Sequence, residues 1–358
     1  MEAPAGQEQG KVAPEATGEQ LAEPMGAPEE KKKNFTVTVR PLGSSEEGTL
    51  VGEYDTLYAA MENCKENDLL NEYVITLNKD YDIPETEGVC DRQQVNILLK
   101  SAEGKTCTLK RFGDQLVFYV RAECKMRTEN IILDGNKDGE LTFLSKNGEL
   151  TLGNGTVVQN FIDVPAADGP AIYLTESSTL NIEDGVIVRE NKGNKQGGVI
   201  GDNSNETKIN ISGGLFENNA FNNAFSTYGG VLATYGTLNI TGGIFRKNSA
   251  EYGGAICVFK GSINIKNATF EENTALKGGA IEAYHTGDFL IEDETILPCD
   301  TNNATIEGCT FSNNGVDDDS DSTRSTRSGG ALFVGASKNV SIKNNKFIKN
   351  TAEDELHP

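Results

Sequence analysis

Residues 245–281 contain two copies of one pattern, Phe245-Arg-Lys-Asn248 leading to Gly253-Gly254-Ala255-Ile256, then Phe270-Glu-Glu-Asn273 leading to Gly278-Gly279-Ala280-Ile281. The phenylalanines lie 25 positions apart, as do the two glycine pairs. An alternating apolar stretch, such as Ile263 and Ile265, follows each glycine pair and is typical of a β-strand. A repeat near 25 residues with three short strands and three turns predicts one coil of a parallel β-helix, in which each strand pairs with its equivalent one coil away.

The same pattern recurs on both sides of this stretch, with weaker copies before residue 197. Its aromatic positions are Phe216, Phe245, Phe270, Phe311 and Phe347, and its asparagines are Asn219, Asn248, Asn273, Asn314 and Asn350. Its glycine pairs begin at Gly197, Gly229, Gly253, Gly278 and Gly329. If equivalent positions stack, the aromatic rings form an internal column and the asparagines form an amide ladder at a turn. The glycine pair allows a positive φ angle and a close approach of neighbouring coils.

The first third of the chain has a different pattern. Phe35-Thr-Val-Thr-Val39 alternates as a strand does, and residues 57–64 place apolar side chains on one face of a helix with Thr56 as N-cap. Further strands are expected at residues 73–77, 95–99 and 116–120. A helix before a long β array can cover the open end of a solenoid core. We therefore predict an all-β fold, a right-handed parallel β-helix with an N-terminal capping helix.

This interpretation divides the chain into four segments. Residues 1–34 are rich in Glu, Ala, Gly and Pro and are expected to be a disordered leader. Residues 35–125 form the cap and first coils, residues 126–350 form the β-helix repeats, and residues 351–358 form a C-terminal tail.

Composition excludes several classes of partner. The 32 Lys and Arg against 54 Asp and Glu give a formal charge of −22. Such a surface repels phosphate backbones and anionic headgroups, so we predict neither nucleic-acid binding nor direct membrane insertion. The first residues lack the pattern of a secretory signal, and no apolar stretch is long enough for a membrane helix.

The repeat resembles the FxxN and GGA(I/L/V) repeat of the chlamydial polymorphic outer membrane proteins, which also occurs in adhesin-like proteins of other bacteria. The motifs that carry the resemblance cover residues 197–350, and Asn130-Ile-Ile-Leu-Asp-Gly-Asn136 is similar to a segment of pectate-lyase-like β-helices. The resemblance implies an extracellular or cell-surface adhesin that binds a glycan or a host or partner protein. The C-terminal β-barrel of those autotransporters is absent from this sequence.

Alignment of the copies suggests one candidate recognition surface. The third residue after the glycine pair varies widely (Gly201, Ala233, Cys257, Glu282, Phe333), so we expect this position to face solvent and Cys257 to be an exposed single thiol. Two positions further on, Tyr235, Phe259 and Tyr284 would form an outward aromatic strip able to stack on a sugar ring or meet an apolar partner. Alternatively, the chain already turns there and the rings cover a corner.

Loops provide further candidates. Insertions between the repeat phenylalanine and the glycine pair collect at one turn of the coil, and the longest carries Asp317, Asp318, Asp319 and Asp321. These carboxylates could hold Ca²⁺, but the run lacks a known calcium-loop pattern, and we interpret it as a solvated loop without a cofactor. Cys299 and Cys309 flank the end of a second insertion and could form a disulfide. The state of the seven cysteines is otherwise open.

An enzyme is the main alternative function. Many right-handed β-helices cleave acidic polysaccharides, with a carboxylate–calcium cluster and a basic residue or with paired aspartates. The signature strings of such lyases and hydrolases are missing here, and the charge of −22 would repel a polyuronate. We therefore predict no catalytic site, with a polysaccharide lyase or glycoside hydrolase as the alternative. The charged groups to inspect for a cleft are Arg121, Arg127, Arg189, Asp134 and Asp163.

Overall fold

The computed structural model describes residues 33–113, 116–137, 141–162, 171–193, 197–221, 227–283, 303–316, 328–335 and 339–352. The chain divides into two units, residues 1–32, which fall outside these ranges, and residues 33–358, to which the following description applies. Residues 1–32 of the proposed leader and residues 353–358 of the proposed tail therefore lie outside the described residues, whereas Lys33 and Asn34 are described and both donate hydrogen bonds to Asp55.

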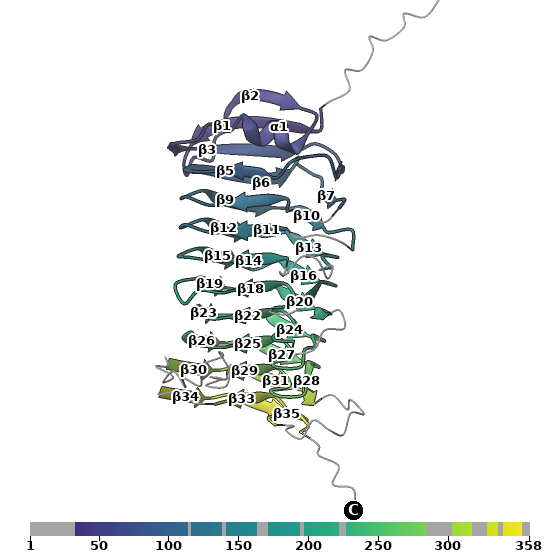
Figure 1. The fold of residues 1–358 in the computed structure, drawn as a ribbon, viewed down its shortest axis with the longest axis vertical. Coiled ribbons are helices and arrows are strands. Elements are labelled where there is room, and N and C mark those ends of the chain that lie inside the picture. Colours follow the sequence, from purple (N-terminus) through teal and green to yellow (C-terminus); the bar gives the residue numbers. More distant parts are fainter. Residues whose placement is uncertain are drawn as a thin grey trace, which may run out of the picture. The chain divides into compact units, whose positions relative to one another are not determined.

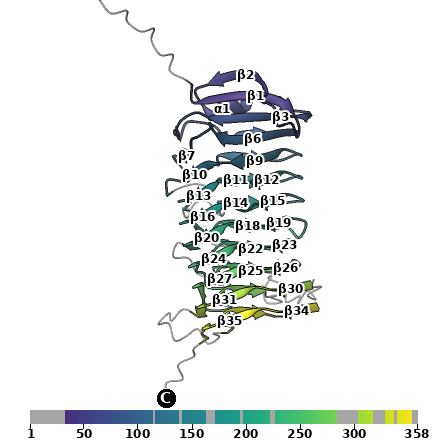
Figure 2. The ribbon, with the colours of Figure 1, turned by 180° about the vertical axis from the view of Figure 1, so that it is seen from behind.

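Three long sheets wind through the second unit, and each coil contributes one strand to each sheet (Figures 1 and 2). In sheet A the spatial order is β2 (Thr49–Tyr54), β1 (Phe35–Pro41), β3 (Asp68–Leu77), β6 (Val95–Ser101), β9 (Lys125–Glu129), β12 (Glu149–Leu152), β15 (Thr179–Ile182), β19 (Lys208–Ile211), β23 (Thr237–Ile240), β26 (Ile263–Lys266), β30 (Asn303–Glu307) and β34 (Asn339–Lys343).

Sheet B follows sheet A in each coil. Its strands are β4 (Tyr81–Ile83), β7 (Cys107–Arg111), β10 (Ile131–Asp134), β13 (Val157–Gln159), β16 (Ile187–Arg189), β20 (Leu215–Glu217), β24 (Ile244–Arg246), β27 (Thr269–Glu271), β31 (Thr310–Ser312) and β35 (Lys346–Ile348).

Sheet C completes the coil. Its strands are β5 (Cys90–Arg92), β8 (Phe118–Val120), β11 (Thr142–Leu144), β14 (Ile172–Leu174), β18 (Ile200–Asp202), β22 (Leu232–Thr234), β25 (Ile256–Val258), β29 (Ile281–Ala283) and β33 (Leu332–Val334). Two small parallel pairs lie between sheets B and C in sequence: β17 (Lys192–Gly193) with β21 (Ala220–Phe221), and β28 (Thr274–Ala275) with β32 (Gly315–Val316).

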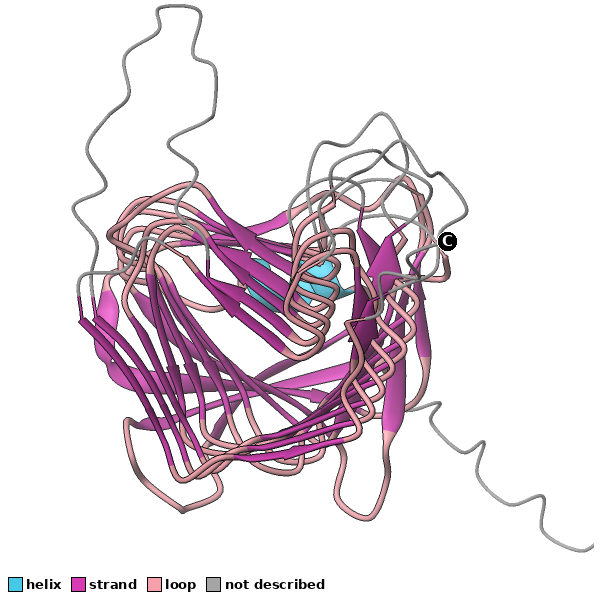
Figure 3. Cartoon of the chain, turned by 90° about the horizontal axis from the view of Figure 1, so that it is seen from below, coloured by secondary structure: helices cyan, strands magenta, loops and turns pink. Residues whose placement is uncertain are grey.

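Strand pairing confirms the predicted right-handed parallel β-helix. From β3 onward every pair within the three sheets is parallel, and equivalent residues of successive coils are in register, as Phe216, Phe245 and Phe270 are. Seen along the stack of coils, the strands superimpose in rows around a common interior (Figure 3). Each coil passes through all three sheets before the chain returns to the first one. The inward apolar residues of the three sheets can therefore be buried in one common core.

Two internal columns specify the register. Phe216, Phe245, Phe270, Phe311 and Phe347 stack nearly parallel, with ring centroids 4.4–5.0 Å apart. Beside them the amides of Asn191, Asn219, Asn248, Asn273, Asn314 and Asn350 form a continuous ladder, each side-chain Nδ2 donating to the next Oδ1 at 2.9–3.0 Å. Both predicted columns are confirmed.

The glycine pairs are required because two coils approach closely there. Gly253 has φ +62°, and a Cβ on Gly254 would lie 2.2 Å from the backbone oxygen of Gly279 in the next coil. No real Cβ contact is that short, so a side chain at the second glycine would force the coils apart.

The N-terminal end of the core is covered as predicted. Helix α1 (Leu57–Glu62) has Thr56 as N-cap, whose hydroxyl accepts a hydrogen bond from the backbone N–H of Ala59 at 3.1 Å. Leu57, Ala60 and Met61 are buried in the same core as the first coils. β1 and β2 form an antiparallel pair beside it, and β2 is the outermost strand of sheet A.

Three of the long connections pass through the same corner of the coil. The chain segments between β13 and β14, between β20 and β22 and between β31 and β33 all run from sheet B to sheet C. This agrees with the prediction that insertions gather at a single turn. The segment between β29 and β30, from sheet C to sheet A, is the second insertion, and its residues 284–302 lie outside the described ranges.

Candidate functional site

The outer face of sheet B carries a ladder of polar and charged side chains. Asp134, Gln159, Arg189, Glu217 and Arg246 occupy equivalent positions in successive coils. Arg189 donates two hydrogen bonds to Gln159 Oε1 at 3.0 and 2.9 Å, and Arg246 donates two to Glu217 Oε2 at 2.8 and 2.6 Å. These groups satisfy one another, which makes the face a stabilised, solvated surface.

The outer face of sheet A is also internally satisfied. Asn210 Nδ2 donates to Asn181 Oδ1 at 2.9 Å, and Asn239 Nδ2 donates to Asn210 Oδ1 at 3.0 Å. On the same sheet, both Nη atoms of Arg127 donate to the carboxylate of Glu183 at 2.7 Å. These hydrogen bonds hold the pKa of Glu183 below its usual value.

Sheet C differs, because its outward side chains are aromatic in three successive coils. Tyr119, Phe143 and Tyr173 are the central residues of β8, β11 and β14 and pair in register. Their ring centroids are 5.3 Å apart for the first pair and 5.7 Å for the second. All three side chains are half-buried. We call these three residues the aromatic column.

Polar groups flank the first ring of the aromatic column. The Arg121 guanidinium lies 4.9 Å from the centre of the Tyr119 ring and donates to both carboxylate oxygens of Asp91, at 3.0 and 2.6 Å. This pairing raises the pKa of Arg121. Ser145 Oγ is 3.5 Å from the Tyr119 hydroxyl. A ring face beside fixed donors and acceptors is the combination found in small-molecule binding sites.

A buried carboxylate lies beyond the last ring. Asp202 accepts hydrogen bonds from the hydroxyls of Thr207 and Thr234, both at 2.5 Å, and from the backbone N–H of Tyr235 at 2.6 Å. Burial raises the pKa of Asp202 although these donors oppose the shift. Burial also raises the pKa of the Tyr173 phenol, with a smaller contribution from Asp202. Asp202 therefore anchors the turn after β22.

Further along sheet C, the prediction of a solvent-facing position is wrong. Gly201, Ala233, Cys257 and Glu282 are buried, and Cys257 is 1% exposed. For Ala233 and Cys257 the reason is that Tyr228 and Tyr252, which follow strands of sheet B, pack over this part of the face. With Tyr235 and Phe259 they form an aromatic cover, in which Tyr228 stacks on Tyr252 at 5.0 Å.

The predicted aromatic strip is part of that cover. Tyr235 and Phe259 do stack, with centroids 4.6 Å apart, but Phe259 is only 4% exposed because Tyr228 lies edge-on against it at 5.0 Å. The expectation that Phe259 points into solvent is therefore wrong, and the alternative reading of rings covering a corner describes it. Tyr284, Asp317, Asp318, Asp319 and Asp321 lie outside the described residues.

Cys257 is not a reactive thiol in this setting. Burial raises the pKa of its thiol well above the ordinary value, and the neighbouring Glu282 raises it further. Burial also raises the pKa of Glu282 to about 8, against the opposing influence of Lys277. Cys309, expected as one partner of a possible disulfide, is a buried free thiol, and Cys299 lies outside the described residues.

The charged residues considered for catalysis do not converge. Arg121 follows a strand of sheet C, Arg127 lies in sheet A, and Asp134 and Arg189 lie in sheet B. Asp134 and Arg189 meet only through Gln159, whose Nε2 donates to Asp134 at 2.8 Å. Asp163 is outside the described residues. Arg127, Asp134 and Arg189 are pairing partners within the two polar faces, and Arg121 pairs with Asp91 beside the aromatic column.

Within the described residues, no three His, Cys, Asp or Glu side chains gather closely enough to hold a metal ion. Among the helices described, none has the length and apolar character needed to span a bilayer.

The comparisons with known proteins give one distant structural similarity. No family model matches the chain, and no curated protein matches it. A solved structure described as ORF18 of Geobacillus virus E2 is similar over 82% of this chain, with 13% sequence identity and a TM-score of 0.34. The chain spans 57% of the length of that protein.

The aromatic column was not predicted from the sequence. Its signal was present: Phe118-Tyr-Val120, Thr142-Phe-Leu144 and Ile172-Tyr-Leu174 each place an aromatic residue between two inward residues. These strands precede the first glycine pair, so alignment on the glycines did not include them.

Proposed function

We propose that the protein is a non-catalytic, glycan-binding β-helix module of the adhesin type, which acts outside the cell or at its surface. The observation that carries the proposal is the aromatic column of Tyr119, Phe143 and Tyr173. Ring faces stack on the apolar faces of sugars, and the partly exposed Arg121–Asp91 pair beside Tyr119 offers hydrogen-bond partners for hydroxyl groups. The cell-surface location rests on the resemblance of the repeat to the chlamydial family.

The other two faces support this choice by contrast. The polar ladders of sheets A and B satisfy their own polar groups, and the apolar side chains beside the sheet B ladder, from Val157 to Ile244, are aliphatic rather than aromatic. The aromatic column is one ring wide, which suits a linear chain of sugars better than a protein surface, since a stable protein interface buries about 800 Å² on each partner. The net charge of −22 favours a neutral glycan over a polyuronate.

The test is binding of the full chain to an array of neutral and acidic oligosaccharides, followed by calorimetry on the best binder. Tyr119→Ala, Phe143→Ala and Tyr173→Ala are each expected to weaken binding about three- to tenfold, the value of one aromatic contact. Phe112→Ala is the matched control, because Phe112 is an exposed ring outside the aromatic column.

Two results would contradict the proposal. Unchanged affinity of the triple variant, at an unchanged melting temperature, would remove the aromatic column as the site. Shortening of the bound oligosaccharide, or formation of unsaturated ends, would replace the binding module by the hydrolase or lyase alternative. Selective binding of protein ligands without any glycan would also overturn it.

A further inference from the structure

The exposed large apolar side chains of the described residues gather at the two ends of the coil stack. Ten of the twelve belong either to the N-terminal cap or to the last coil, and the two elsewhere are Phe112 and Ile244. The ten are Leu42, Leu50, Val51, Tyr58, Leu69, Leu70, Val340, Ile342, Phe347 and Ile348. Solenoids remain monomeric when polar residues cover their ends, so this distribution indicates that the ends make contacts.

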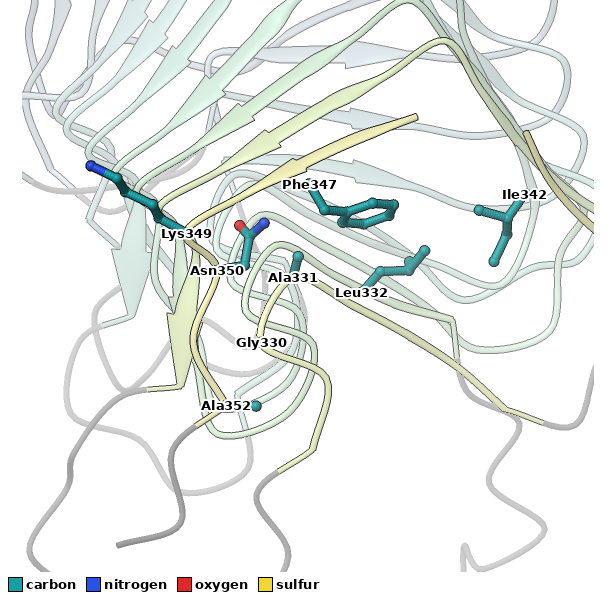
Figure 4. Close-up of a pocket in the computed structure, with 8 residues that line it drawn as sticks. All are labelled: Gly330, Ala331, Leu332, Ile342, Phe347, Lys349, Asn350 and Ala352. Carbon is teal, nitrogen blue, oxygen red and sulfur yellow. The ribbon is translucent and has the colours of Figure 1, made fainter. Parts of the chain in front are cut away.

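In the last described coil, apolar side chains of the core are partly exposed. Phe347 ends the phenylalanine stack, 5.0 Å from Phe311, and is 50% exposed. It borders a hollow of about 380 Å³ together with Leu332 and Ile342 (Figure 4). β33, β34 and β35 are the outermost described strands of sheets C, A and B. We call the exposed side of this coil the tail face.

The N-terminal end presents a second free strand. β2 is the outermost strand of sheet A at that end and carries the exposed Leu50 and Val51. Tyr58, 41% exposed on α1, lies in the same cap. We call this surface the cap face. An unpaired strand edge next to apolar side chains is a template for pairing with another strand.

Strand directions make the two faces compatible. β2 is antiparallel to β1, β1 is antiparallel to β3, and the rest of sheet A from β3 to β34 is parallel. β2 and β34 therefore run in the same direction. A second copy displaced along the stack would place its β2 beside β34 as a parallel pair, which is the pairing used between the other coils of sheet A.

The charges of the two faces are complementary. The tail face carries the exposed Lys343, Lys346 and Lys349, with no Asp or Glu between residues 339 and 352. The cap face carries the exposed Glu47 and Glu53. Contact between two tail faces would place lysines against lysines, whereas contact of tail with cap joins opposite charges.

We propose that the tail face binds the cap face of a second copy of this chain, so that sheet A continues from β34 of one copy into β2 of the next. Such a contact joins two different surfaces, and each copy keeps one of each surface free. The assembly is therefore linear and grows with concentration.

The test is the concentration dependence of the mass of the full chain, measured by sedimentation velocity. Two double variants reverse the charge of one face each: Lys346→Glu with Lys349→Glu on the tail face, and Glu47→Lys with Glu53→Lys on the cap face. Each alone is expected to raise the dissociation constant of self-association by about tenfold or more. An equimolar mixture is expected to regain association, because every tail then meets a cap of opposite charge.

The matched control for the tail variant is Lys192→Glu with Lys208→Glu, which changes the net charge equally at exposed positions in the middle of the stack. This variant is expected to associate like the wild type. Four outcomes would overturn the proposal: a wild type that stays monomeric, a control as weak as the tail variant, a cap variant that still associates, or a mixture that does not recover. Association seen only after removal of residues 353–358 would assign the tail face to the chain's own C-terminus and also overturn it.

Discussion

Asn248→Ala removes one rung of the buried amide ladder, and its cost follows from the hydrogen bonds of that side chain. Asn248 Nδ2 donates to the backbone oxygen of Phe216 and to Asn273 Oδ1, each at 3.0 Å. Asn248 Oδ1 accepts from the backbone N–H and from Nδ2 of Asn219, each at 3.0 Å. The residue is fully buried, so water does not replace these partners.

The four bonds do not contribute equally. The N–H of Asn219 would be left buried without the acceptor it has here, at a cost of about 1–3 kcal/mol. The other three bonds contribute about 0.5–1.5 kcal/mol each, since Asn219 Nδ2 still donates to the backbone oxygen of Val188. We therefore expect a loss of about 2.5–7.5 kcal/mol in the free energy of unfolding.

Denaturation by urea, followed by circular dichroism, measures this loss, and hydrogen exchange at the Asn219 amide measures its local part. Asn239→Ala is the control: it removes one amide hydrogen bond on the half-buried outer face of sheet A and should cost about 1 kcal/mol or less. Equal losses in the two variants, or unchanged protection of the Asn219 amide, would refute the reasoning.

Three further predictions concern the core and its titratable groups. Gly254→Ala should prevent native stacking of the coils or strongly lower the melting temperature, because the new Cβ would clash with the backbone of Gly279. Gly104→Ala is the control: its Cβ would enter open space, so the positive φ alone should lower the free energy of unfolding by only about 1 kcal/mol. Glu282 keeps its proton in the native state up to a pKa of about 8, whereas in the unfolded chain it loses it near pH 4.5, so stability should fall as pH rises through that window. Glu282→Gln should remove this part of the pH dependence and should be more stable than the wild type at pH 9, as thermal unfolding from pH 4 to 9 can check; an unchanged profile would contradict the assignment. A thiol reagent should label at most one cysteine per native chain, and seven after unfolding, because six thiols are buried: Cys64, Cys90, Cys107, Cys124, Cys257 and Cys309.

The interior of the β-helix could be predicted from the sequence because every coil repeats the same packing problem. A phenylalanine recurs where the ring of the previous coil needs a partner, and an asparagine recurs where the turn needs two donors and an acceptor. The capping helix was predictable for local reasons, namely the Thr56 N-cap and the spacing of Leu57, Ala60 and Met61. Each of these signals depends only on neighbours in sequence or one period away.

The outer surface was predicted less well. Alternation along a strand tells which face a side chain points to, but it does not tell whether another segment covers that face. Cys257 does point away from the core of sheet C, and Tyr228 and Tyr252 then cover it from a turn whose length varies between coils. The residue type at this position varies because the segment that packs on it differs between coils. That variation therefore did not indicate exposure to solvent.

Because the repeated Phe, Asn and Gly-Gly positions stack only on their equivalents in neighbouring coils, the number of coils can change without a change in the cross-section of the solenoid. Removing or duplicating one complete period, such as residues 245–269, leaves every remaining ring and amide with a neighbour of its own kind. A single residue inserted within a strand instead turns the later side chains of that strand to the opposite face. Chain length can thus change in whole turns of the solenoid, while the aromatic column at residues 119–173 keeps its geometry. The length of the solenoid and the chemistry of its outer surface are therefore separable, and each can vary without altering the other.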